Sequence, residues 1–193
     1  PGAPIGLDVE RDELAFFPLI YWPMTERQAT LSDGARARIN TYLRNGGTIL
    51  FDTRDQNLSG IGGVGPGTQT LRSLVGGLDI PALLEIPTTH VLTKAFYLLH
   101  EFPGRWEGGR LFVQKPDERV NDGVSSVIIG ANDFAAAWAI DATGRPMFSV
   151  VPGSARQREL AFRFGVNLVM YALTGNYKAD QVHVDEILER LGQ

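Results

Sequence analysis

Apolar residues in this chain gather into short continuous runs and into stripes at helical spacing. Residues 16–22 and 48–51 are apolar at almost every position, which is typical of strands buried on both faces of a parallel sheet. Between these runs, Ser32 and Gly46 are suited to begin and end a helix. The side chains that form its apolar stripe are Ala35, Ile39, Tyr42 and Leu43. Strand, helix and strand in this order predict a βαβ unit.

Prolines and glycines mark where the other expected elements begin and end. Because proline cannot donate to a strand ladder, Pro18 places the start of the first strand near itself or places that strand at a sheet edge. A glycine-rich loop covers residues 56–67, and residues 78–99 have no clear period, so we expect residues 90–99 to form an irregular covering segment. The remaining pattern predicts strands at 111–114, 124–129 and 147–151, and helices at 68–75, 132–141, 157–173 and 184–191.

The longest helical stripe lies near the end of the chain. Its apolar residues are spaced by four, four and three positions: Leu160, Phe164, Leu168 and Tyr171. Thr174 and Gly175 predict the end of this helix, and a second amphipathic helix follows. Strands that alternate with helices predict an α/β domain with a mostly parallel sheet.

The composition fits one such domain and narrows its function. A chain of 193 residues holds one sizeable core, so we expect residues 1–13 to be a linker or N-terminal extension and 14–193 to form a single domain. The formal charge of -4 disfavours a nucleic-acid partner. The absence of cysteine excludes disulfides, thiolate metal sites and a cysteine nucleophile. No run of about 18 apolar residues is present, so the sequence given does not span a membrane.

Polar residues stand directly after two expected strands, where open α/β sheets bind their ligands. They are Asp52, Thr53, Arg54 and Asp55 after the strand at 48–51, and Asn132 and Asp133 after the strand at 124–129. The first group suits an acid/base pair with a cation, an anion or metal site, or a network that caps the turn. The second group suits a helix cap or a contribution to the same crevice.

His100 and Glu101 are a further candidate pair, beside an aromatic, turn-rich segment. The three histidines lack the spacing of a zinc site, and we expect neither a metal nor a cofactor. Residues 60–65 satisfy G-x-G-x-x-G. They stand well beyond the preceding strand and Pro66 follows them, which favours a surface loop over a nucleotide site. No G-x-S-x-G or P-loop motif is present.

Four stretches, residues 16–23, 31–55, 96–105 and 158–178, resemble an uncharacterised bacterial domain family related to class I glutamine-amidotransferase-like and ThuA-like folds. The resemblance covers nearly the whole chain and implies a flavodoxin-like three-layer α/β sandwich. It also implies a parent protein with a BatA-like (aerotolerance-regulator-like) membrane segment upstream, which agrees with a start that has no methionine. We therefore expect a soluble domain held at the membrane by that upstream region, on the extracytoplasmic side.

In amidotransferases a strand-to-helix elbow carries the nucleophilic cysteine. The turn at 52–55 looks like the counterpart of that elbow, and it has no thiol. A histidine that often follows the equivalent strand in ThuA-like proteins is also missing. The resemblance therefore implies that glutaminase activity is not inherited.

Three hypotheses follow for the function. The first is a non-catalytic binding or interaction domain for a small ligand or protein partner. The second is a hydrolase or sugar-modifying enzyme with Asp52, Arg54, Asp55, His100 and Glu101 around one crevice. The third is a scaffold that forms a homo-oligomer through its aromatic loops.

Overall fold

The computed structural model describes the chain except residues 1–3, 59–63, 116–124 and 192–193, with side chains described up to Thr174. Within this part, five strands form one open sheet in the order β1-β2-β5-β4-β3. The parallel strands are β1 (Leu19–Pro23), β2 (Thr48–Asp52) and β5 (Val127–Gly130), and β4 (Phe112–Gln114) is antiparallel to β5 and to β3 (Leu83–Glu85). The α/β prediction with a parallel centre is confirmed.

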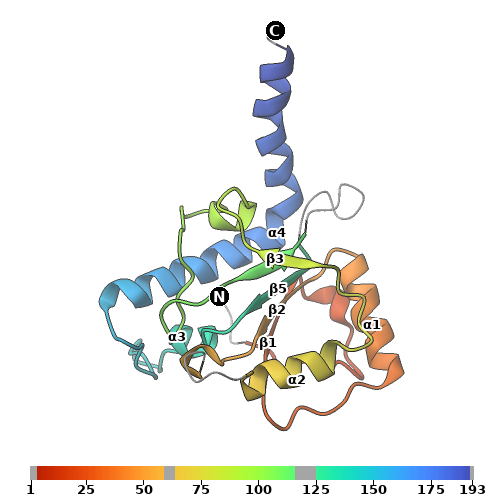
Figure 1. Cartoon of the computed structure of the whole chain (residues 1–193), viewed down its shortest axis with the longest axis vertical. Helices are drawn as coiled ribbons and strands as arrows, with labels where there is room; N and C mark the ends of the chain where they lie inside the picture. The colour runs from red at the N-terminus through yellow and green to blue at the C-terminus, as the bar shows by residue number, and fades with distance from the viewer. Residues whose placement is uncertain (1–3, 59–63, 116–124, 192–193) are drawn as a thin grey trace.

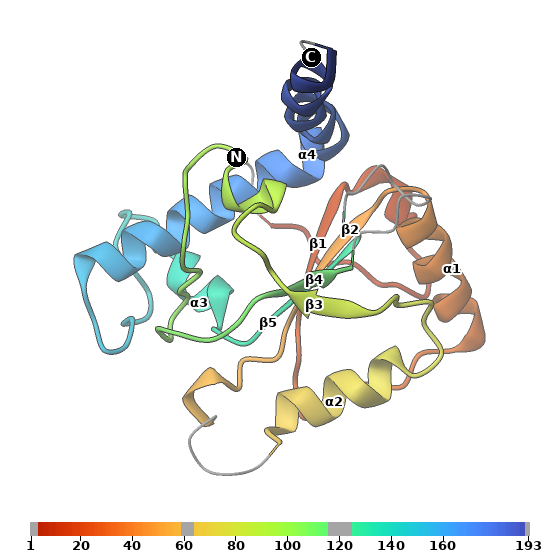
Figure 2. The same ribbon diagram turned by 45° about the horizontal axis from the view of Figure 1, so that its top comes forward.

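Helices cover both faces of the sheet (Figures 1 and 2). On one side lie α1 (Asp33–Arg44) and α2 (Pro66–Val75), and on the other lie α3 (Phe134–Trp138) and α4 (Ala155–Leu191). The short 3-10 helices are η1 (Leu14–Phe16), η2 (Gln56–Leu58) and η3 (Val91–Thr93). Strand β2 alternates between the two cores, because Ile49 and Phe51 pack with α1 and α2 while Leu50 packs with α3 and α4.

The first βαβ unit is built as the sequence predicts. The Ser32 hydroxyl accepts a hydrogen bond from the Ala35 amide at the start of α1, and Gly46 takes a left-handed φ of 89° just after its end. Tyr42 lies in the core and its hydroxyl donates to the carbonyls of Phe17 and Thr48. Pro18 precedes β1, and β1 is an edge strand, so both predictions from that proline are confirmed.

Two expectations about the elements are wrong, and one strand was not predicted. Residues 147–151 form no strand, and only Val151 makes an isolated bridge, to Trp106. Strand β3 was not expected, because prolines flank this three-residue element and leave too few positions for a period to show. Helix α4 does not end at Gly175 but runs to Leu191, since one glycine costs a helix only about 1 kcal/mol.

Smaller differences concern boundaries. Helix α2 begins at Pro66, two residues before the expected start, and α3 is shorter than the helix expected at 132–141. Most of the glycine motif at 60–65 lies outside the described residues. In the expected linker, Leu7 and Val9 pack against the α1–α2 core, and the Glu10 carboxylate accepts from Ser32.

Within the described residues, no helix is both long and apolar enough to cross a bilayer.

A partly buried histidine, His90, ties the segment before η3 to the start of β5. His90 Nδ1 accepts from the Leu92 amide at 3.2 Å, so its Nε2 carries the proton and faces Ser125 Oγ at 3.3 Å. The His90 ring lies 5.5 Å from the ring of Tyr171, whose hydroxyl accepts from the Ser125 amide. Burial lowers the pKa of His90 to about 4.

This histidine predicts an acid-sensitive fold. The unfolded chain takes up the His90 proton near pH 6.5 and the folded chain only near pH 4, so stability is full above pH 6.5 and falls as the pH drops to about 4. We expect this loss to be roughly 2–3 kcal/mol. Urea unfolding from pH 7.5 to pH 4 should show a shallower pH dependence in His90→Asn. The exposed His100→Asn is the control, and an unchanged slope in His90→Asn would contradict this assignment.

Candidate functional site

A crevice opens where the carboxyl ends of β2 and β5 meet. The chain leaves β2 toward α2 on one face of the sheet and leaves β5 toward α3 on the other face, as Figure 1 shows. Diverging connections of this kind form the usual ligand crevice of open α/β sheets. The crevice encloses about 530 Å³. Its walls include residues from the β1–α1 loop, the turn after β2, the start of α2, the segment before β4 and the β5–α3 turn: Met24, Thr25, Glu26, Arg27, Thr53, Arg54, Asp55, Asn57, Leu58, Pro66, Gly67, Arg105, Trp106 and Asp133.

Asp52 lies beneath the crevice and is 0% exposed. Its Oδ2 accepts from the Tyr21 hydroxyl at 2.8 Å and the Phe134 amide at 2.7 Å. Its Oδ1 accepts from the amides of Arg54 at 3.1 Å and Asp133 at 3.3 Å. Burial raises the pKa of the Asp52 carboxyl above its ordinary value, and these donors oppose the rise. The same burial, with the Asp52 charge next to it, raises the pKa of Tyr21 well above its usual value.

Two residues above Asp52 adopt the left-handed backbone conformation that non-glycine residues seldom take. Arg54 has a φ of 63° and Asp133 a φ of 53°. Both donate their amides to Asp52, which fixes the two turns toward each other. Across the gap, Arg54 Nε donates to Asp133 Oδ1 at 3.1 Å, and Arg105 Nη1 lies 3.6 Å from Asp133 Oδ2.

This geometry corrects the expected position of the strand-to-helix elbow. After β2 the chain enters η2 and a loop, and α2 begins only at Pro66. After β5, the left-handed Asp133 stands directly before α3. The arrangement of strand, turn and α-helix therefore belongs to Asp133 and not to the turn at 52–55, because an α-helix closely follows β5 whereas the 3-10 helix η2 follows β2.

Asp55 serves the start of α2. Its Oδ1 accepts from the Gly67 amide at 3.1 Å and its Oδ2 from the Thr68 amide at 2.6 Å, so it acts as the cap that Gly65 cannot supply. A Cβ on Gly67 would lie 1.8 Å from the Thr53 carbonyl oxygen, so only glycine lets α2 approach this closely. Thr53 is buried and its amide donates to the Gly130 carbonyl.

Asn132 holds the segment before β4 against the crevice. The Asn132 side-chain NH₂ donates to the backbone carbonyls of Trp106 and Gly108. The Asn132 backbone carbonyl accepts from the Trp106 backbone amide. A Cβ on Gly104 would lie 2.4 Å from the Asn132 carbonyl oxygen. These contacts bring Arg105 and Trp106 to the mouth of the crevice.

The other sequence candidates lie elsewhere. His100 and Glu101 are exposed, and Glu101 lies 3.9 Å from Arg156 near the start of α4. Neither residue lines the crevice. Among the described residues, no group of three or more His, Cys, Asp or Glu side chains is placed to hold a metal ion.

Sequence reasoning missed several lining residues, among them Arg27, Arg105 and Trp106. Arg105 follows Pro103 and Gly104 in a segment that gave no strand or helix period. Its guanidinium lies 5.1 Å from the ring centre of Trp106 and 5.6 Å from that of Phe148. The Arg–Trp pair in a turn-rich segment was the available signal, since arginine packs readily on aromatic rings.

Replacing Asp52 with asparagine should strongly destabilise the domain. An asparagine at this position would replace one carboxylate oxygen with an NH₂ group, which donates and cannot accept. The N–H or O–H groups that now donate to that oxygen would be left buried without an acceptor. We expect Asp52→Asn to lower the free energy of unfolding by roughly 2–4 kcal/mol. The control Asp79→Asn removes only an exposed ion pair with Arg44 and should cost less than about 0.5 kcal/mol. Equal losses in urea unfolding would contradict this role of Asp52.

Comparison with known proteins identifies the family of this chain. Residues 1–173 match the family described as Domain of unknown function (DUF4159). No curated protein matches the chain. The matched region contains every element from η1 to α3, the first part of α4 and all the residues that line the crevice. The chain therefore belongs to the family described as Domain of unknown function (DUF4159).

Proposed function

We propose that this domain is a non-catalytic binding module whose strand-end crevice takes an anionic ligand, one that carries a carboxylate or phosphate group. The observation that carries the proposal is the placement of Arg54 and Arg105 on opposite oxygens of Asp133. Asp133 is only 7% exposed, whereas the arginine side chains are 43% and 34% exposed. The acid is thus covered and the two cations line the open crevice.

The arginines retain donors for a ligand. A guanidinium has five N–H donors, and Arg54 uses only its Nε toward Asp133. Arg105 is held between two aromatic rings and by Asp133, so little side-chain freedom is lost when it binds. Arg27, which also lines the crevice, has no hydrogen bond or ion pair with any described residue. Planar guanidinium groups suit carboxylate and phosphate oxygens in pairs.

Of the three acidic residues on the walls, Asp55 and Asp133 are already engaged, and Glu26 is exposed on the β1–α1 loop. Both oxygens of Asp55 accept amides at the start of α2, and both oxygens of Asp133 face arginines. The first amides of α2 are thus occupied by Asp55, so side chains and not the helix end would bind the ligand.

Attachment of the module to a membrane-anchored parent, with an amidotransferase-like or ThuA-like origin, is likewise a proposal and rests on the sequence resemblance.

Citrate is a suitable probe, because its three carboxylates can reach several arginines. We expect citrate to cause saturable amide shifts at Thr53–Gln56 and at Trp106 in ¹H–¹⁵N spectra, at constant ionic strength. Arg54→Gln and Arg105→Gln should each weaken binding about tenfold, since each loses a charged hydrogen bond of about 1.4 kcal/mol. Arg44→Gln, which removes an exposed arginine far along α1, is the control. Neither citrate nor inorganic phosphate causing saturable shifts at these residues would contradict the proposal.

One observation favours a second candidate, a hydrolase. Asp133 has a left-handed φ directly between β5 and α3, the position in which α/β-hydrolases hold their nucleophile, and aspartate can act as one. Against this candidate, two guanidiniums hold the carboxylate, and no histidine lines the crevice among the described residues.

Hydrolysis assays separate the two candidates. We expect the chain to release no nitrophenol above the buffer rate from p-nitrophenyl esters, phosphates or glycosides, because two arginines hold the Asp133 carboxylate and no histidine lines the crevice among the described residues. Release that Asp133→Asn abolishes and Arg44→Gln leaves unchanged would establish the hydrolase in place of the binding module.

A further inference from the structure

Helix α4 carries a second apolar stripe that the core does not use. The stripe consists of four large side chains that are 40–59% exposed: Phe162, Val166, Val169 and Leu173. At 100° per residue they fall within about 60° of the helix circumference. The buried side chains Ala161, Phe164, Leu168 and Tyr171 lie on the opposite side of α4. We name the exposed stripe the α4 seam.

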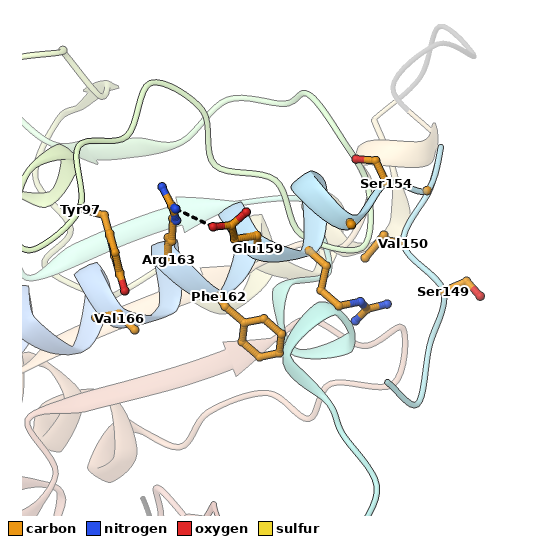
Figure 3. A pocket seen from close by; sticks show the side chains of 11 residues that line it. Tyr97, Ser149, Val150, Ser154, Glu159, Phe162, Arg163 and Val166 are labelled. Carbon is orange, nitrogen blue, oxygen red and sulfur yellow. Dashed lines mark hydrogen bonds and ion pairs between the residues drawn. The ribbon is translucent and has the colours of Figure 1, made fainter. Parts of the chain in front are cut away.

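A groove continues the α4 seam at its amino-terminal end. It encloses about 720 Å³ between α4, Tyr97 and the segment that leads into α4. Figure 3 shows Phe162 and Val166 along the same side of the helix, with Tyr97 beyond them. Further apolar side chains on the neighbouring segments are exposed: Phe96, Leu98, Met147, Phe148 and Val151. Exposed apolar side chains gathered along one helix face and its groove mark an interaction site.

We propose that the α4 seam pairs with the α4 seam of a second copy of this chain, antiparallel and about a two-fold axis. The spacing along the seam is four, three, four, which reads the same in both directions. A two-fold axis midway along it sets Phe162 against Leu173 of the partner subunit and Val166 against Val169 of the partner subunit. The surface is therefore complementary to itself, as a two-fold interface requires, and the spacing is that of paired helices.

The charges around the seam also fit a second copy. Between Phe162 and Leu173 the only charged residue is Arg163, which already pairs with Glu159 at 2.5 Å and lies over the Tyr97 ring. Arg158, which lines the groove, donates to the carbonyls of Ala137 and Phe148, so pairing of two seams leaves no charge without a partner.

The same charges favour the antiparallel direction. Arg158 and Glu159 flank the line of the seam about one turn before Phe162, and a parallel pair would bring each beside its like, including the two Glu159 carboxylates. An antiparallel pair separates them by about 25 Å along the axis, well beyond the Debye length of about 8 Å. Opposed helix dipoles are also favourable in this arrangement.

The test uses the absence of cysteine from the chain. Phe162→Cys and Leu173→Cys chains are oxidised with glutathione disulfide, separately and mixed. We expect a disulfide in the mixture at least tenfold faster than in either variant alone, because like positions in the antiparallel pair lie about 16 Å apart. Thr89→Cys, in an exposed turn, measures random collision.

Sedimentation equilibrium of the unsubstituted chain from 10 μM to 1 mM completes the test. We expect a concentration-dependent dimer whose dissociation constant rises at least tenfold in Val166→Asp. Phe16→Asp, which removes an exposed apolar side chain on η1, should leave that constant unchanged. A monomer at every concentration, a dimer that Val166→Asp does not weaken, or faster self-coupling of each cysteine variant than of the mixture would overturn the proposal.

Discussion

The geometry of the strand-end region depends on one buried carboxylate. Asp52 accepts from β1 through Tyr21, from its own turn through Arg54, and from the β5–α3 turn through Asp133 and Phe134. A buried acid needs such donors, and the donors need the acid, so the three segments are held together as a unit. The left-handed backbones of Arg54 and Asp133 persist because Asp52 binds their amides. The shape of the crevice thus follows from the hydrogen bonds that the buried Asp52 carboxylate accepts beneath it.

The sequence predicted the part of the fold that local chemistry decides. Ser32, Gly46 and the apolar runs mark α1, β1 and β2 without reference to the rest of the chain, and the structure places them there. Polar residues after β2 and β5 also meet, because parallel neighbouring strands end at the same edge of the sheet. Arg105 could not be placed in this way, since its position depends on Asn132 and Gly104, which are distant from β2 in the sequence.

Helix α4 shows that a clear apolar stripe in the sequence can predict a helix without revealing every apolar face of that helix. The buried stripe was found because its intervals stand out, yet the same helix carries the α4 seam on its other side. A helix that is apolar on two sides has a weaker helical period, and a glycine within it then suggests an end that does not occur. Only the position of the core against one side distinguishes the residues that fold the domain from those left for a partner.

The proposed anion site is a crevice in which the covered acid Asp133 holds two arginines toward the ligand. The most direct measurement is a crystal structure of the domain grown with citrate at neutral pH. We predict a citrate carboxylate within hydrogen-bond distance of the Arg54 and Arg105 guanidiniums, with both arginines still on Asp133. An empty crevice at saturating citrate, with Arg54 and Arg105 turned away from Asp133, would contradict it.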